Sequence, residues 1–174
     1  MDRKEKRVLG LALIVLSFTV MGVSAYVYQQ ATMTLSQTIV EIASITVKNS
    51  DLGSINEGET KTITKATVAD LGDAISITTT TSPVYLHLSS DVDSLIGSYT
   101  IYDIDVLYAT VPGGGTGTPG NIVCTLDLSV PNYSSITLDA VGTWTFDLEL
   151  ETAASSVDID TATTVTITVS AEST

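Results

Sequence analysis

Apolar and polar residues alternate along most of the chain after residue 30. The clearest case is TWTFDLELE at 143–151, where Trp144, Phe146, Leu148 and Leu150 fall on one side and hydroxyl or acidic residues on the other. A period of two predicts β-strands with one buried face and one wet face. The same pattern predicts strands at 74–81, 84–88, 102–108, 124–130 and 163–169.

The breaks between these segments have the composition of turns. NSDLGS at 49–54, NEGE at 56–59 and PNYSS at 131–135 are rich in Gly, Asn, Asp and Ser, which favour tight turns. Short strands at regular intervals, with almost no helical periodicity, predict an all-β fold. We expect an antiparallel two-sheet sandwich of jelly-roll type.

The N-terminus has the pattern of an export signal. MDRKEKR carries four of the seven Lys and Arg residues, and the next sixteen residues contain no charge. Small residues at Val23–Ala25 fit cleavage after Ala25. This predicts a signal peptide at 1–25, a donor strand with its lead-in at 26–48, and a β-sandwich domain at 49–174.

Two other interpretations of this N-terminus stay open. Residues 8–28 are long and apolar enough to be a membrane anchor that is never removed. Cleavage near Gly10 would instead leave a hydrophobic assembly helix of the type IV pilin kind. Gly10 does not directly follow a Lys or Arg, and the strand pattern begins by about residue 31, which disfavours the pilin helix.

The charge balance restricts the partners. The whole chain has a net charge of −13, and most of its few basic residues lie in the first seven positions. A surface this acidic repels phosphate, so nucleic acid and anionic lipid are disfavoured. Contact with a membrane is expected only through residues 8–28, if they are retained.

The chemistry of a catalytic or zinc site is sparse. His87 is the single histidine and Cys124 the single cysteine, so an internal disulfide and a structural zinc site are excluded. His87 alternates with apolar neighbours and is expected to face away from the core. No nucleophile motif accompanies it. We therefore expect no enzyme activity and no cofactor.

Acidic pairs are the only candidates for metal binding. Asp91 with Asp93, Asp103 with Asp105, and a third pair at 158 and 160 have a spacing that places both carboxylates on one face of a strand or in one loop. Calcium requires several hard oxygens, and a pair supplies only part of that set. Solvated acidic faces and a weak cation site are both compatible with the spacing.

Two further segments carry expectations. VPGGGTGTPG at 111–120 is half glycine and predicts a long exposed loop or flexible flap between two strands. Asn132, Tyr133 and Ser134 form an N-glycosylation sequon, which places a candidate modification site at Asn132 in the predicted turn.

The first strand after the signal is the segment most relevant to function. Ala31, Met33, Leu35 and Ile39, with Gln37 on the same side, alternate with threonine and serine, so residues 31–40 predict a strand with one mainly apolar side suited to a groove. It can form an edge of its own sandwich. Alternatively, it can complete the sheet of a neighbouring copy, and this head-to-tail contact would repeat into a filament.

Residues 23–48, VSAYVYQQATMTLSQTIVEIASITVK, resemble the TasA and camelysin family of biofilm fibre proteins and their archaeal relatives, the bundling pili and surface threads. Many bacterial members have a Phe-Ser-Asp type sequence near the mature start, whereas this chain has YVYQQ at 26–30, so the archaeal proteins are the better match. The resemblance implies assembly by donor-strand complementation, in which the N-terminal strand of one subunit completes the next.

These observations favour a secreted structural subunit of a pilus or matrix fibre on the cell surface. Its expected partners are other copies of itself and, at the level of whole filaments, neighbouring fibres. The alternative is a membrane-anchored or surface-layer-associated β domain that acts as a spacer or binds cations or glycans.

Overall fold

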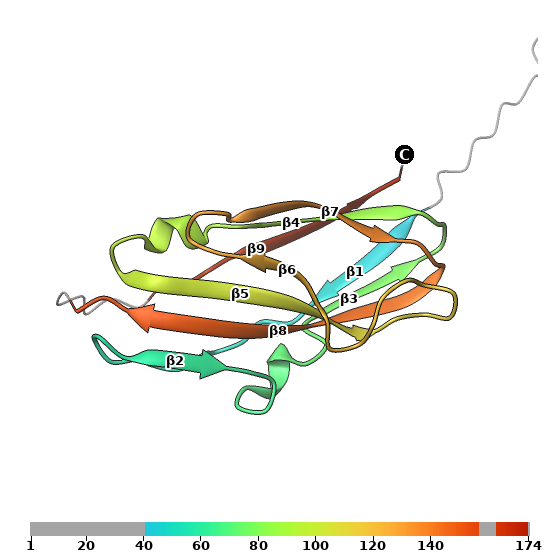
Figure 1. Cartoon of the computed structure of the whole chain (residues 1–174). Helices are drawn as coiled ribbons and strands as arrows, with labels where there is room; N and C mark the ends of the chain where they lie inside the picture. The colour runs from blue at the N-terminus through green and yellow to red at the C-terminus, as the bar shows by residue number, and fades with distance from the viewer. Residues whose placement is uncertain (1–40, 157–162, 174) are drawn as a thin grey trace, which may run out of the picture. The chain divides into compact units, whose positions relative to one another are not determined.

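The computed structural model describes residues 41–156 and 163–173, which form a β-sandwich of two antiparallel sheets (Figure 1). The expected all-β, two-sheet architecture is therefore confirmed. The predicted donor residues Ala31, Met33, Leu35 and Ile39, the segment at 1–25, and the acidic pair at 158 and 160 lie outside the described residues.

The larger sheet has the strand order β1–β3–β8–β5–β6. β2 pairs with the C-terminal half of β8, beyond the part that pairs with β3. Its strands are β1 (Ala43–Val47), β3 (Ile75–Thr79), β8 (Gly142–Ala154), β5 (Tyr99–Thr110), β6 (Ile122–Leu126) and β2 (Thr60–Ile63). The longest ladder joins β5 to β8, with Ile104 opposite Leu150 and Val106 opposite Leu148.

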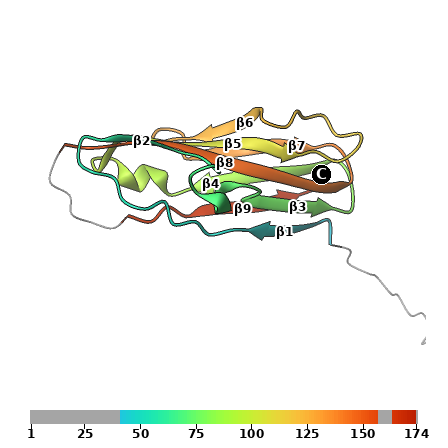
Figure 2. The same cartoon turned by 90° about the horizontal axis from the view of Figure 1, so that it is seen from below.

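The smaller sheet has the order β7–β4–β9, with β7 at Asn132–Leu138, β4 at Val84–Ser90 and β9 at Ile167–Glu172. Two short 3-10 helices, η1 (Ala69–Leu71) and η2 (Val92–Leu95), lie in the connections. Figure 2 shows β6 and β7 along one side of the sandwich, and β1 and β9 along the opposite side.

The alternating side chains of β8 form the centre of the core. Trp144 and Phe146 are fully buried, and Leu86 and Leu138 face them from the smaller sheet. The indole N–H of Trp144 donates to the carbonyl of Ala140 at 3.0 Å, which satisfies the one polar group that this large side chain buries. The predicted inward face of 143–151 is therefore confirmed.

Three strand boundaries differ from the sequence prediction. PNYSS was expected to be a turn, but β7 begins within it at Asn132. The strand predicted at 124–130 ends at Leu126, because the Asp127 carboxylate accepts the backbone N–H groups of Ser129 and Val130, both at 2.7 Å, and closes a turn. The predicted strand at 163–169 is shifted toward the C-terminus, as β9.

The division at residue 48 also differs from the structure. Residues 43–47, which the sequence prediction includes with the donor segment, form β1 and pair with β3 along its whole length. The N–H of Lys48 continues this ladder to the carbonyl of Ala74 at 2.9 Å. The sandwich therefore includes β1 and begins before residue 49.

The glycine-rich loop at 111–120 joins β5 to β6, as expected, but it packs against the sandwich and is not a free flap. Gly115 lies over Trp144 so closely that an added Cβ would be 2.7 Å from the ring atom Cη2. The N–H of Thr116 donates to the Asp139 carboxylate at 2.9 Å, and its hydroxyl donates to the other carboxylate oxygen. Glycine is needed here for close approach to an aromatic ring.

Candidate functional site: a groove between the two sheets

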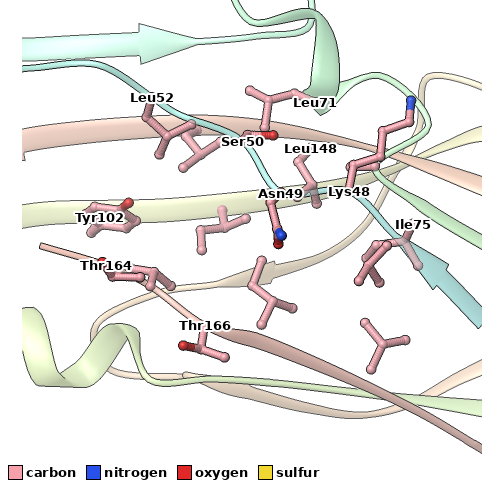
Figure 3. Close-up of a pocket in the computed structure, with 17 residues that line it drawn as sticks. Lys48, Asn49, Ser50, Leu52, Leu71, Ile75, Tyr102, Leu148, Thr164 and Thr166 are labelled. Atoms are coloured by element: carbon pink, nitrogen blue, oxygen red, sulfur yellow. The ribbon is translucent and has the colours of Figure 1, made fainter.

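The side of the sandwich bordered by β1 and β9 contains a groove of about 350 Å³ (Figure 3). Its floor is apolar and comes mainly from the inner face of the larger sheet, with Tyr102 and Ile104 on β5, Leu148 and Leu150 on β8, and Leu71 from η1. The rims are the chain at 47–52 after β1 and the chain at 164–169 leading into β9. The groove thus lies between the two sheets, beside β1 and β9, which are not paired with each other in the described part of the chain.

The side chains around the groove carry little charge. Figure 3 shows Leu52, Leu71 and Leu148 on one side of the group and Thr164 and Thr166 on the other. Lys48 is the only charged residue among the described residues that line the groove, and its ammonium group donates to the carbonyl of Gly72 at 2.6 Å. In a chain with a net charge of −13, the absence of carboxylates from this described part of the lining suits an uncharged occupant.

The rim strand β9 has an open hydrogen-bonding edge. Thr166 is oriented toward the end of β4, because its N–H donates to the Asp91 carboxylate at 2.7 Å and its carbonyl accepts from the N–H of Asp91 at 3.3 Å. Neighbouring residues in an antiparallel strand direct their backbone groups to opposite sides. The N–H and C=O groups of Ile167, Val169 and Ala171 therefore point away from β4, where no described strand pairs with them.

The rim strand β1 has an open edge for the same reason. Ile42 and Lys48 bond to the β3 side, through Thr80 and Ala74 respectively, so Ala43, Ile45 and Val47 direct their backbone groups away from β3. No described strand pairs with that edge. Because β1 and β9 run in opposite directions (Figure 1), a strand placed between them would be antiparallel to one and parallel to the other.

The apolar side chains of the two edges are incompletely covered. Ile167, Val169 and Ala171 face the core but are only half-buried, as are Ala43 and Ile45, and Val47 is 51% exposed. The corresponding residues of the central strands are almost completely buried, such as Ile77 on β3 and Leu86 on β4. The sandwich is therefore incompletely filled on this side, which is the property of a site that accepts another strand.

The structure places the two predicted carboxylate pairs, Asp91 with Asp93 and Asp103 with Asp105, in different parts of the fold. Asp91 bonds to Thr166 as described above, and Asp93 lies in η2. Asp103 and Asp105 are on the outer face of β5, where their cross-strand neighbours on β8 are Glu151 and Glu149. The Asp105 carboxylate accepts the hydroxyl of Thr125.

Asp103 lies in a shallow depression of about 430 Å³ that Asp127 and Glu151 also line. Burial raises the pKa of the Asp103 carboxyl, and the charges of Asp127, Glu151 and Asp105 raise it further. Among the described residues, no three His, Cys, Asp or Glu side chains converge in a way that could hold a metal ion. The depression is therefore an acidic surface, and we do not assign it as a metal site.

The other residues that the sequence analysis considered are His87, Cys124 and Asn132, and none of them lines the groove. His87 faces outward from β4, and its Nε2 is 2.9 Å from a carboxylate oxygen of Glu172 on β9. Cys124 is buried, and burial raises the pKa of its thiol to about 12, with a smaller contribution from Asp105. Asn132 is exposed at the first position of β7.

The groove is the functional feature that sequence reasoning did not find. The alternation of Ile167, Val169 and Ala171 was visible in the sequence, but the open edge beside them depends on which strands pair.

In the described part of the chain, no helix is long and apolar enough to cross a membrane.

The chain matches no family model and no curated protein. Its similarity to fibre proteins therefore stays a prediction based on residues 23–48. The groove is the structural feature on which a function can be argued.

Proposed function

We propose that this chain is the structural subunit of an extracellular pilus or matrix fibre, and that residues 31–39 of one copy occupy the groove of the next. The observation that supports this proposal best is an apolar groove bordered by two open strand edges. An added strand would pair with an open backbone edge and place every second side chain on the apolar floor.

The length of the segment fits the rim. Nine extended residues span roughly 30 Å at about 3.3 Å per residue, and the rim chain at 163–172 is of similar length. The alternation of the donor segment places Ala31, Met33, Leu35 and Ile39 on one side, together with the uncharged Gln37. Each large apolar side chain that becomes fully buried contributes roughly 1.5–3 kcal/mol, which would offset the cost of ordering a terminal segment.

The charge of the segment also fits. Residues 8–40 contain no Asp, Glu, Lys or Arg, and the next charged residue is Glu41. An ionised side chain would lose its hydration in the groove, whereas threonine and serine on the opposite side of the segment can remain in contact with water. An uncharged strand is therefore compatible with the groove, whose described lining carries a single charge, at Lys48.

Electron microscopy of the processed chain tests the proposal. Wild type is expected to form filaments, and deletion of residues 26–40 to leave soluble particles. A synthetic peptide of residues 26–40, added at about 100 times its dissociation constant, should stabilise the truncated protein by about 2.7 kcal/mol. Filaments from the truncated protein would contradict the donor role.

Two matched substitutions separate the two faces of the donor. Leu35→Asp should abolish filaments, because a carboxylate would be placed on the apolar floor, whereas Thr34→Asp should retain them, because that side chain faces outward. Stable monomers of wild type, in which the segment protects the groove of its own chain from hydrogen exchange, would instead show that residues 31–39 complete their own sandwich.

A further inference from the structure

An N-glycosylation sequon is Asn, then any residue except Pro, then Ser or Thr. Of the four asparagines in the chain, only Asn132 fits, because Tyr133 and Ser134 follow it. Its side chain is exposed, and it makes no hydrogen bond with the described residues. Asn56, by contrast, donates its side-chain amide to Glu59 at 2.7 Å. The amide of Asn132 is therefore free to react.

The sheet register places Asn132 on the outside of the sandwich. It pairs with Ser89 of β4, and cross-strand partners point to the same face of a sheet. Leu88, the neighbour of Ser89, is buried in the core, so Ser89 and Asn132 face outward. A large group attached to Asn132 would meet solvent and would not displace any core side chain.

The strand that carries Asn132 is an edge. The smaller sheet has the order β7–β4–β9, and no described strand pairs with the outer side of β7. Exposed edge strands can pair with other molecules and cause aggregation. The groove is at the opposite edge of the same sheet, about 10 Å away across two strand spacings, and it opens between the sheets while Asn132 faces outward.

We propose that Asn132 is an N-glycosylation site, and that its glycan covers the β7 edge while leaving the β9 edge and the groove accessible. This proposal depends on export of the chain, which is part of the proposed function. The glycan would confine strand addition to one edge of the smaller sheet, because a bulky hydrophilic group blocks close approach of a second backbone at the other.

The donor for this modification is an oligosaccharide linked through a phosphate to a lipid. The amide nitrogen of Asn132 bonds to the anomeric carbon of the first sugar, and the bond from that carbon to the phosphate oxygen breaks. The lipid phosphate leaves with the electron pair, and the amide nitrogen gives up one proton to a base of the transferase. No oxidant or reductant is needed.

The test uses the full-length, folded chain with a purified oligosaccharyltransferase and a lipid-linked oligosaccharide, and a short sequon peptide serves as the positive control. We expect the intact mass to rise by one oligosaccharide and peptide mapping to place it on Asn132. Asn132→Gln and Ser134→Ala should remain unmodified, and Ser134→Thr, which preserves the sequon, should be modified.

An unmodified wild-type chain in a reaction that modifies the control peptide would overturn the proposal, as would an equal mass increase in Asn132→Gln. Failure here is distinguishable from failure of the fibre hypothesis. Asn132→Gln should still form filaments, and Leu35→Asp should lose filaments while it keeps the modification at Asn132.

Discussion

At the scale of single residues, the glycine-rich loop shows how local composition differs from local structure. Five glycines in ten residues predicted a flexible flap, yet Gly115 lies against Trp144 and Thr116 bonds to Asp139. Composition could not reveal this, because the partners are distant in the sequence. The glycines permit close packing here as well as flexibility.

Gly115→Ala should therefore lower the free energy of unfolding by roughly 1–3 kcal/mol, the usual cost of overpacking. The added Cβ would also be 2.9 Å from Val111, so both the ring and its neighbour would have to move. Urea unfolding followed by tryptophan fluorescence measures the change. Gly113→Ala is the matched control, because a Cβ there meets nothing within 4 Å; equal stability of the two variants would contradict the packing argument.

The acidic pairs on the outer face of β5 and β8 affect the stability of the fold. Because the folded state raises the pKa of Asp103 above the ordinary value of 3.8, its protonated form is favoured by folding. The contribution of the protonated carboxyl to the free energy of unfolding is complete below pH 3.8. It is lost as the pH rises through the pKa that Asp103 has in the folded state. At neutral pH the ionised Asp103 opposite Glu151 is therefore destabilising.

Asp103→Asn should raise the free energy of unfolding at pH 7 by roughly 0.2–1 kcal/mol, which is the usual size of an interaction between side chains directly opposite on neighbouring strands. The gain should shrink in high salt, which screens exposed charges, and disappear below pH 3.8. Thermal unfolding as a function of pH measures it. Glu57→Gln, in the exposed turn before β2, is the control; a gain as large in that variant would assign the effect to net charge alone.

At the scale of elements, the strands and their buried faces were predictable, whereas some boundaries were not. PNYSS has the composition of a turn, yet Pro131 stands just before β7, where its missing N–H is not needed. Asp127 ended β6 early by bonding to its own neighbours. The turn at Asp127 depends on side-chain-to-backbone hydrogen bonds and the start of β7 on its pairing with β4, and periodicity represents neither.

The open edge of β9 gives a prediction for this strand. Proline lacks an N–H. Val169→Pro should remove a donor that points to the groove and leave the ladder to β4 intact, so the protein should stay folded and lose filament formation. Thr168→Pro removes a donor that points to β4 and should destabilise the fold itself. Circular dichroism and electron microscopy distinguish the two effects.

Filaments of Val169→Pro with wild-type appearance would show that the added strand does not pair with β9. The corresponding substitution on the other rim, Ile45→Pro, would then test pairing with β1, whose open edge has the same orientation of backbone groups. The two substitutions together identify the strand that accepts the donor.

At the scale of the whole molecule, the two sides of the sandwich differ. β6 and β7 approach each other on one side, and β1 and β9 approach each other on the other, where the groove lies (Figure 2). Carboxylates gather on the outer face of β5 and β8, whereas the groove lining has none within residues 41–156 and 163–173. In the proposed fibre, this distribution would keep these carboxylates away from the contact between subunits, which would reduce charge repulsion there.

The sequence by itself determined the β-strands, the side chains that each strand buries and the uncharged N-terminal segment, because period-two alternation and the absence of charge are local properties. Only the tertiary structure decided which strands are edges, where the groove lies and that Asn132 is on a strand facing outward. Those features depend on pairing between distant segments, such as Asp91 with Thr166 and Ile104 with Leu150, and no local pattern specifies such a partner.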